Sequence, residues 1–216
     1  MADVAADFAD DGVLVDALRR GDEAAFGWLL DRYDASLRRL ARSYVATPAA
    51  VEEVVQDTWM AVITGVGRFE QRSAVKTWLH RILANRARST GVRERRSVPF
   101  ASLSDELDAD QPAVDPGRFR RRGRRAGAWA APPSAWDEEP EEHLLAAETL
   151  DAVERAVATL PPNQQAVLSL RDLEGWTAAE ACNALELSET NQRVLLHRAR
   201  ATVRRALETY FEDDPR

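Results

Sequence analysis

The sequence has one cysteine, one lysine and no long run of apolar residues. A single cysteine, Cys182, excludes an internal disulfide and a metal site built from several cysteines, so we expect neither a metal nor a cofactor. No window reaches the roughly 20 apolar residues of a membrane span. The first residues, MADVAADFADDG, lack the basic start and apolar centre of a secretory signal. We therefore expect a cytoplasmic protein that does not contact a membrane.

The residues of common catalytic sites are also scarce. The three histidines, His80, His143 and His197, lie far apart in the sequence. No nucleophile triad and no glycine-rich phosphate loop accompany them. The sequence therefore predicts a protein that is not an enzyme and has no small-molecule substrate.

Charge is distributed unevenly along the chain. The formal net charge of -7 argues at first against a nucleic-acid partner. However, exposed charges more than about 8–10 Å apart are largely screened at physiological salt, so local charge matters more. The segment from Arg68 to Arg96 holds nine basic residues and only two acidic ones. A basic stripe on an acidic background predicts DNA binding at chosen places and weak indiscriminate binding by the isolated chain.

Apolar residues recur at helical spacing over most of the chain, and no strand-like alternation stands out. The repeat from Phe26 to Tyr44 predicts a first helix, and Pro48 precedes a second one from about Ala49 to Gly65. A third helix carries Trp78, Leu79, Ile82 and Leu83. Further on, Asn163 can cap a helix that extends to Asp172. The predicted fold class is all-α.

Composition divides the chain into zones. Residues 97–140 are rich in proline and glycine and have no sustained period, which is typical of a linker. We therefore predict two small helical domains joined by a long irregular linker. The predicted boundaries are an acidic N-terminal segment at 1–21, a helical domain at 22–96, the linker at 97–140, a second helical domain at 141–211 and a tail at 212–216.

The segment Thr177–Leu207 has the layout of a helix-turn-helix, with a short helix, a tight turn at Glu186 and a longer helix with five arginines. Thr177 and Ser188 can cap the two helices. Glu186 stands where a left-handed backbone is expected, at a cost of about 1 kcal/mol for a non-glycine residue. Packing of the first helix is expected against Leu187, Val194 and Leu195. The alternative interpretation is an ordinary helical hairpin with a solvated basic face.

Two separate segments, in the right order, carry a resemblance to a known family. The stretch AVEEVVQDTWMAVITGVGRFEQRSAVKTWLHRILANRARS (Ala50–Ser89) resembles region two of bacterial RNA polymerase sigma factors of the extracytoplasmic-function class. The stretch LPPNQQAVLSLRDLEGWTAAEACNALELSETNQRVLLHRARATVRRAL (Leu160–Leu207) resembles region four. The resemblance implies a transcription initiation factor that binds core polymerase, recognises −10 and −35 promoter elements and promotes melting.

The resemblance also implies roles for individual residues. The helix that would dock on the clamp of the largest polymerase subunit carries Glu52, Glu53, Gln56, Asp57 and Thr58. The residues implied in −10 binding and melting are Arg68, Arg72, Ser73, Ala74, Lys76, Arg81, Asn85 and Arg88. Those implied in −35 binding are Thr177, Ser188, Glu189, Thr190, Gln192, Arg193, His197, Arg198 and Arg200. Trp78 is expected to pack inside, with stacking on a base as the alternative.

The implied partners are promoter DNA and core RNA polymerase, both at the clamp and at the flap of the second-largest subunit. An anti-sigma factor is a further expected partner. Lys76 stands where family members frequently carry an aromatic residue, and the NQRV of the last helix replaces a more common segment, so base preferences do not transfer. The competing function is a stand-alone helix-turn-helix regulator, which would bind its operator without polymerase.

Overall fold

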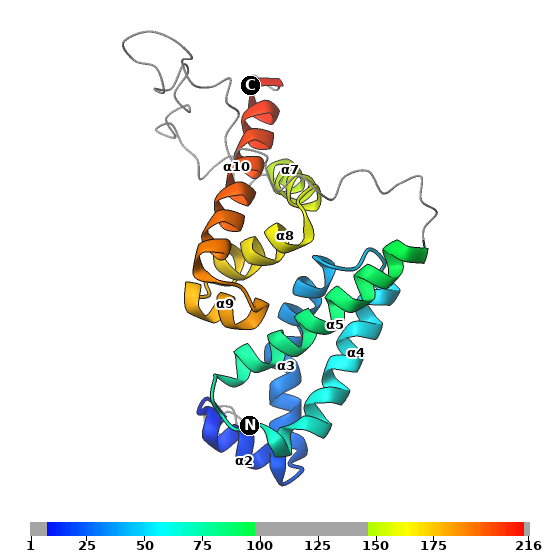
Figure 1. The fold of residues 1–216 in the computed structure, drawn as a ribbon, viewed down its shortest axis with the longest axis vertical. Coiled ribbons are helices and arrows are strands. Elements are labelled where there is room, and N and C mark those ends of the chain that lie inside the picture. Colours follow the sequence, from blue (N-terminus) through cyan, green and yellow to red (C-terminus); the bar gives the residue numbers. More distant parts are fainter. Residues whose placement is uncertain (1–7, 98–146, 214–216) are drawn as a thin grey trace. The chain divides into compact units, whose positions relative to one another are not determined.

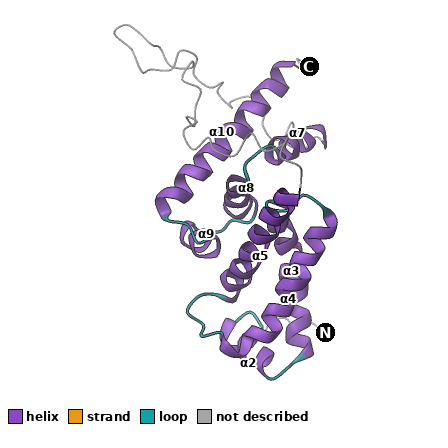
Figure 2. Ribbon diagram, turned by 45° about the vertical axis from the view of Figure 1, so that its right-hand side comes forward, coloured by secondary structure: helices purple, strands orange, loops and turns teal. Residues whose placement is uncertain are grey.

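The computed structural model describes residues 8–97 and 147–213, and all regular structure in these ranges is helical (Figure 2). The predicted all-α class is therefore confirmed for this part of the chain. The predicted linker lies outside the described residues except for Ser97, as do positions 1–7 and 214–216. Two compact units emerge: Met1–Ser102 with Ala166–Gln192, and Leu103–Gln165 with Arg193–Arg216.

The first unit is built on three long helices that pack on one another: α3 (Glu23–Arg42), α4 (Pro48–Gly65) and α5 (Val75–Ser97) (Figure 1). Local sequence sets where they begin. The Asp22 carboxylate accepts hydrogen bonds from the amides of Ala24 and Ala25 at 2.9 and 3.3 Å. Thr47 caps α4, whose first residue is the expected proline. The largest side chains of the core include Leu29, Leu37, Leu40, Val54, Leu79 and Leu83.

A further helix, α2 (Asp11–Arg19), lies within the segment described above only as acidic. Asp10 caps it, with hydrogen bonds of 2.8 and 3.0 Å from the amides of Gly12 and Val13. Leu14, Val15 and Ala17 are buried. The helix packs on α3 and on the short 3-10 helix η1 (Val66–Arg68). Residues ahead of position 22 thus complete the hydrophobic core of the first unit.

Helix α5 approaches the main chain after α3 very closely at Gly91. A Cβ atom at this position would lie 2.2 Å from the carbonyl oxygen of Tyr44. That distance is far below van der Waals contact, so only glycine fits without movement of the backbone. Gly91 therefore fixes how closely α5 passes the end of α3.

The first unit also contains the end of α8 (Pro162–Leu168), a π-helical turn η4 (Ser169–Leu173) and α9 (Ala178–Leu185). The predicted helix from Asn163 to Asp172 is therefore two elements, and Asn163 lies inside α8 rather than at its cap. Thr177 caps α9 in a reciprocal arrangement with Glu180, as the sequence suggested for Thr177. Helix α9 packs on α5.

The second unit contains α7 (Ala147–Ala158) and most of α10 (Glu189–Asp213). Its described buried apolar residues are alanines and leucines. Ala152, Ala156 and Leu160 are buried in the stretch that ends at Gln165, and Leu196, Ala199 and Leu207 are buried in the stretch that begins at Arg193. Successive residues within each of these two sets are three, four or eight positions apart, which are spacings that recur on one side of an α-helix.

Candidate nucleic-acid interface

A cavity lies between the loop that follows η1 and the first turns of α5. It has a volume of about 560 Å³. The loop contributes Phe69, Glu70, Arg72 and Ser73, and α5 contributes Thr77, Trp78, Arg81 and Ile82. Three arginines, Arg68, Arg72 and Arg81, surround it. Cationic groups around an aromatic wall suit a nucleotide, with its phosphate and its flat base.

The aromatic wall of this cavity is a pair of stacked rings. The rings of Phe69 and Trp78 lie 4.4 Å apart between centroids, at an interplanar angle of 21°. Both residues line the cavity, but Phe69 is buried whereas Trp78 is half-buried. The expectation that Trp78 packs inside is therefore only partly met, because one part of the indole remains accessible.

The loop has a defined shape. Gln71 adopts a left-handed backbone conformation, with φ of 55°. On either side of it, Arg72 pairs with Glu70 at 2.6 Å, and the Arg72 side chain is 85% exposed. Ala74 is also exposed and Ser73 is half-buried. The loop thus exposes the Arg72 side chain, while the left-handed Gln71 bends its backbone.

The remaining basic residues predicted on α5 have partners within the first unit. The Lys76 ammonium lies 2.8 Å from a Glu180 carboxylate oxygen and 4.2 Å from the centroid of the Trp176 ring. The Lys76 hydrogen bond is the main reason that the pKa of Glu180 falls to about 2, with a smaller effect of the Thr177 amide. Arg88 donates to Asn85 Oδ1 at 3.1 Å and to the Leu185 carbonyl.

The exposed side of α4 is acidic, and each of its carboxylates faces an arginine of a neighbouring helix. Glu52 is held by both terminal nitrogens of Arg38, which lower the pKa of Glu52. Asp57 lies 3.3 Å from Arg86, and Glu53 lies 3.6 Å from Arg93. Exposed pairs of this kind contribute little to stability because solvent screens them, so a competing partner can replace them at little cost.

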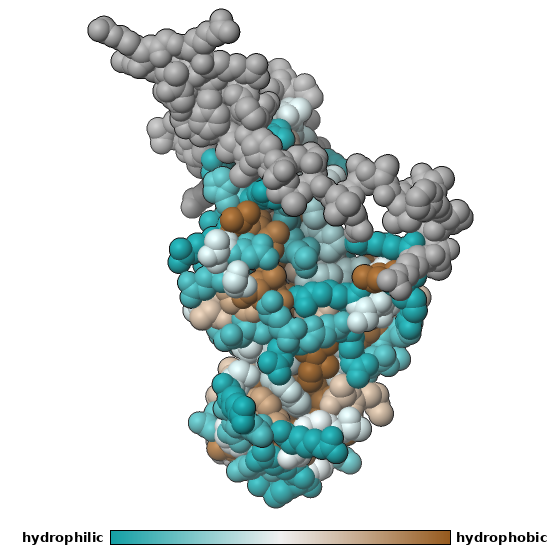
Figure 3. All heavy atoms as spheres, in the orientation of Figure 1, coloured by the Kyte–Doolittle hydropathy of each residue, from teal (hydrophilic) through white to brown (hydrophobic). Residues whose placement is uncertain are grey.

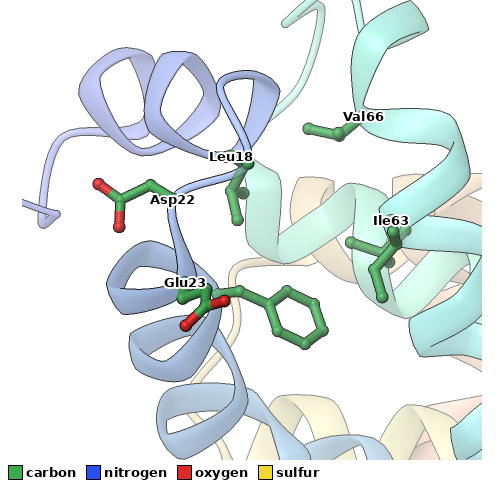
Figure 4. A pocket seen from close by; sticks show the side chains of 8 residues that line it. Leu18, Asp22, Glu23, Ile63 and Val66 are labelled. Carbon is green, nitrogen blue, oxygen red and sulfur yellow. The ribbon is translucent and has the colours of Figure 1, made fainter.

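Apolar side chains continue the exposed side of α4 beyond the acidic residues. Met60 is 59% exposed and Ile63 is 50% exposed. Next to Ile63 lies a cleft of about 260 Å³ between α2, α3 and α4. The side chains of Leu18, Ile63 and Val66 point into it, whereas the Asp22 carboxylate points away (Figure 4). Elsewhere, the face visible in Figure 3 is mostly hydrophilic, with small separate hydrophobic patches.

The turn before α10 has the geometry predicted from the sequence. Glu186 is left-handed, with φ of 55° and ψ of 45°, and the Leu187 amide bonds the Cys182 carbonyl at 3.0 Å. Ser188 caps α10 through the amide of Asn191 at 3.2 Å. Several predicted −35 residues of this segment are exposed or half-buried: Thr177, Ser188, Glu189, Thr190, Arg193, His197, Arg198 and Arg200.

Comparisons with known proteins agree with this arrangement. Residues 29–97 match the model of Sigma-70 region 2, and residues 150–203 match that of Sigma-70, region 4. The ECF RNA polymerase sigma factor SigM of Mycobacterium tuberculosis H37Rv is 29% identical over 197 residues, which cover 91% of this chain and 84% of SigM. The chain belongs to the extracytoplasmic-function (ECF) sigma factors. Its function is that of a transcription initiation factor.

Other relatives of this sigma factor extend the comparison. The ECF RNA polymerase sigma-E factor of Escherichia coli K12 is 28% identical over 193 residues, which cover 89% of this chain and 92% of that factor. Two solved structures, each 22% identical, share the fold. CnrH in complex with the cytosolic domain of CnrY gives a TM-score of 0.58 and covers 92% of this chain and 97% of that one. RpoE of Bartonella quintana, in complex with the anti-sigma factor NepR, gives 0.56 and covers 85% and 96%.

The structure corrects the prediction for Thr58. Its side chain is 0% exposed, and its hydroxyl donates to the Val54 carbonyl at 2.7 Å. The family resemblance had grouped Thr58 with the acidic residues of the same motif. The helical turn instead points it into the core, so its side chain is not available on the exposed side of α4.

Gln192 and its neighbours on α10 also require a correction. Gln192 is 2% exposed, and among the described residues its Nε2 has no hydrogen-bond partner. It is therefore not available to a base edge here. The buried side of α10 carries Gln192, Leu196 and Ala199, whereas Val194 is 42% exposed. The prediction that Val194 packs against the preceding helix was thus wrong, because Val194 lies on the exposed side of α10.

Sequence reasoning missed a buried polar cluster around His80. Its Nδ1 lies 2.8 Å from the Lys76 carbonyl, and its Nε2 lies 2.7 Å from the Ser36 hydroxyl. Ser36 also bonds Glu174 at 2.6 Å. Burial lowers the pKa of His80 to about 4, against smaller opposing effects of the Lys76 carbonyl and Glu174. The sequence gives no signal for this cluster, because its members are up to 138 positions apart.

The described residues offer neither a metal site nor a membrane span. Over residues 8–97 and 147–213, no three side chains of His, Cys, Asp or Glu form a group that could hold a metal ion. None of the helices in these ranges combines the length and the apolar character that a membrane crossing demands.

Proposed function

We propose that this sigma factor binds core RNA polymerase and directs it to promoters by reading a −10 and a −35 element and helping to open the duplex. The observation that carries this proposal is the cavity beside the loop. It combines the stacked Phe69 and Trp78 rings with Arg68, Arg72 and Arg81 at its edges. Such a site accepts a base turned out of the duplex, and the contacts offset the few kcal/mol that unstacking costs.

Helix α5 would then hold the backbone of the separated strand. Asn85 and Arg81 are exposed on α5. Lys76 and Arg88 are engaged by Glu180 and by the Leu185 carbonyl, and a phosphate would have to replace these acceptors. Phosphate contacts set position on the strand, whereas the cavity distinguishes bases.

The acidic side of α4 is the proposed docking surface for the clamp of the largest polymerase subunit. Glu53, Gln56 and Asp57 are exposed there, and Glu52 is half-buried. Their present arginine partners are weakly held, so arginines of the clamp can take over. Met60 and Ile63 add apolar area, which gives affinity that does not depend on charge.

The start of α10 is the proposed −35 reader, with Glu189, Thr190 and Arg193 exposed on its first turns. The flap of the second-largest subunit is the proposed partner of this region. By analogy with RpoE and CnrH, whose structures contain NepR and CnrY, we also propose an anti-sigma partner. A cytoplasmic location and the absence of enzymatic activity belong to the same proposal.

The test is transcription with purified components. The full chain and core polymerase are incubated with a promoter library, and transcript start sites are scored by sequencing. We expect start sites that share two elements and that are absent with core polymerase alone. Replacing Arg81 by Ala should reduce initiation at these promoters by about tenfold or more, as for the loss of a charged contact.

The matched control is Arg42→Ala, which removes an exposed arginine from the end of α3, away from the cavity residues. It should initiate like the unchanged chain. Sequence-specific duplex binding without polymerase, together with no start sites, would instead identify a stand-alone helix-turn-helix regulator.

A further inference from the structure

Two side chains of α2 form hydrogen bonds with the backbone at the two ends of the loop beside the cavity. The Asp11 carboxylate accepts a hydrogen bond from the amide of Val75 at 2.8 Å, and Val75 is the first residue of α5. Arg19 Nη2 donates to the carbonyl oxygen of Phe69 at 2.6 Å. Phe69 directly follows η1, so the residues between these two hydrogen bonds are the loop itself. In Figure 1, α2 lies beside the start of α5.

The hydrogen bond between Asp11 and the Val75 amide is an N-terminal cap of α5 that is supplied by another helix. The first amides of a helix have no partner within it, and a carboxylate that accepts from one of them fixes where the helix begins. Asp11 is 64 positions away from Val75, so its contact also ties the two elements together. Lys76, Thr77 and Trp78 follow at once, and the last two line the cavity.

The hydrogen bond from Arg19 to the Phe69 carbonyl is supported by further contacts of α2. Arg19 Nη1 lies 3.3 Å from Asp16, one turn earlier on α2, which orients the guanidinium. Helix α2 is itself immobilised, because Leu14, Val15 and Ala17 are at most 1% exposed. A rigid element therefore holds both ends of a loop that is otherwise exposed.

Between these two hydrogen bonds the loop has a bent backbone that needs stabilising contacts from other elements. Gln71 is left-handed at φ of 55°, a conformation that costs energy for a residue with a side chain. Arg72 and Ser73, next to it, form part of the cavity wall. A site that is already shaped before its ligand arrives avoids the entropy cost of ordering on binding.

We propose that Asp11 and Arg19 are positioning residues for −10 recognition, which they support by holding the loop and α5 in the shape that receives the separated strand. This inference rests on the proposed function, because it needs the loop to bind promoter DNA. It assigns a role in promoter recognition to a helix that precedes the matched region, residues 29–97. Neither side chain lines the cavity, so they act through the backbone and touch no base.

The experiment uses holoenzyme assembled from core polymerase and the full chain, with a promoter found in the transcription test. The probe is a fluorescent single-stranded oligonucleotide with the non-template −10 sequence, and a scrambled oligonucleotide serves as reference. The ratio of the two affinities measures discrimination. For Asp11→Ala and Arg19→Ala we expect this ratio to fall by about fivefold, the equivalent of one lost helix cap.

Rescue and control variants separate positioning from general destabilisation. Asparagine caps helices as well as aspartate, so Asp11→Asn should keep the discrimination of the unchanged chain. Arg20→Ala removes the exposed arginine that directly follows α2 and should also keep the discrimination of the unchanged chain. The affinity of each variant for core polymerase, measured in parallel, should be unchanged, whereas a folding defect would lower it together with discrimination.

Three outcomes would overturn the inference. Discrimination could survive Asp11→Ala and Arg19→Ala, or Asp11→Asn could fail like Asp11→Ala, or polymerase affinity could fall in parallel. An unchanged holoenzyme that does not distinguish the −10 oligonucleotide from the scrambled one would overturn the proposed function itself. That result concerns the unsubstituted chain, so the two failures are distinguishable.

Discussion

His80 is the residue with the most perturbed environment among the described histidines. Its ring is 0% exposed and lies against Trp176, with a centroid distance of 4.6 Å. The titratable groups around it are Glu174 and Lys76, and Tyr33 packs edge-on against its ring. A neutral imidazole suits this setting because burial and, to a smaller extent, the Lys76 ammonium disfavour a positive charge on the ring.

This setting predicts that the unit loses stability in acid. The pKa of His80 is about 4 in the folded chain, and an unfolded histidine titrates near 6.5. Between these values the unfolded chain takes up a proton that the folded chain does not. The free energy of unfolding should therefore be unaffected by His80 above pH 6.5 and fall by up to about 1.4 kcal/mol per pH unit below it.

The measurement is urea unfolding of the full chain at several pH values from 4 to 8. His80→Gln should flatten the pH dependence in the acid range, whatever its effect on stability at pH 7. His197→Gln, which changes an exposed histidine, is the matched control and should retain the dependence of the unchanged chain. A steeper loss of stability in His80→Gln would mean that Glu174 holds a protonated His80.

At the scale of elements, the passage of α5 past the end of α3 depends on Gly91. The Cβ of Gly91→Ala would lie 2.2 Å from the Tyr44 carbonyl oxygen, which is backbone and cannot rotate away. We expect a loss of about 1–3 kcal/mol of unfolding free energy, as for other overpacked sites. Thermal and urea unfolding of the full chain measure it.

The control for Gly91 is the same substitution in the interior of α3. A Cβ at Gly27 meets no atom within 4 Å. Gly27→Ala should therefore stabilise the chain by about 0.5–1 kcal/mol through helix propensity alone. If both substitutions had the same effect, the close approach of α5 to Tyr44 would be wrong.

Local features of the helices were predictable from sequence, whereas their tertiary contacts were not. Thr177, Ser188 and Glu186 were correctly placed as caps and as a left-handed turn, because each depends on neighbours a few positions away. Thr58 and Gln192 were misplaced, since a family motif read along the chain does not say which of its residues lie on the buried side of a helix.

The candidate site follows the same division. The family motif carried the cavity residues Arg68, Arg72, Ser73 and Arg81 into the prediction. Asp11 and Arg19 had no motif to mark them, and the acidic composition of their segment concealed the helix that bears them. Contacts made by a carboxylate or a guanidinium with a distant backbone atom leave no periodic pattern in a sequence.

At the scale of the molecule, the net charge of -7 opposes DNA binding by the isolated chain. Negative charge elsewhere repels DNA while the basic groups of α5 attract it, and Lys76 is already paired. We expect the isolated chain to bind promoter duplex no more tightly than is typical of sequence-independent DNA binding, with a dissociation constant above about 1 µM at 0.15 M salt. Holoenzyme should bind at least about a thousandfold more tightly.

Fluorescence anisotropy with labelled promoter duplex tests this expectation, with the chain alone, with core polymerase alone and with both. The reference is a duplex of the same length in which both promoter elements are scrambled. Tight, sequence-dependent binding by the chain alone would contradict the expectation and favour the stand-alone regulator.

The contacts of α2 also determine how this protein can be cut into working pieces. The family match begins at residue 29, after α2 has ended. A fragment that starts there would leave the Phe69 carbonyl and the Val75 amide without their partners and would expose the apolar surface that Leu14 and Val15 cover. A fragment that keeps these loop and core contacts of the first unit therefore has to include α2 together with its capping residue, Asp10.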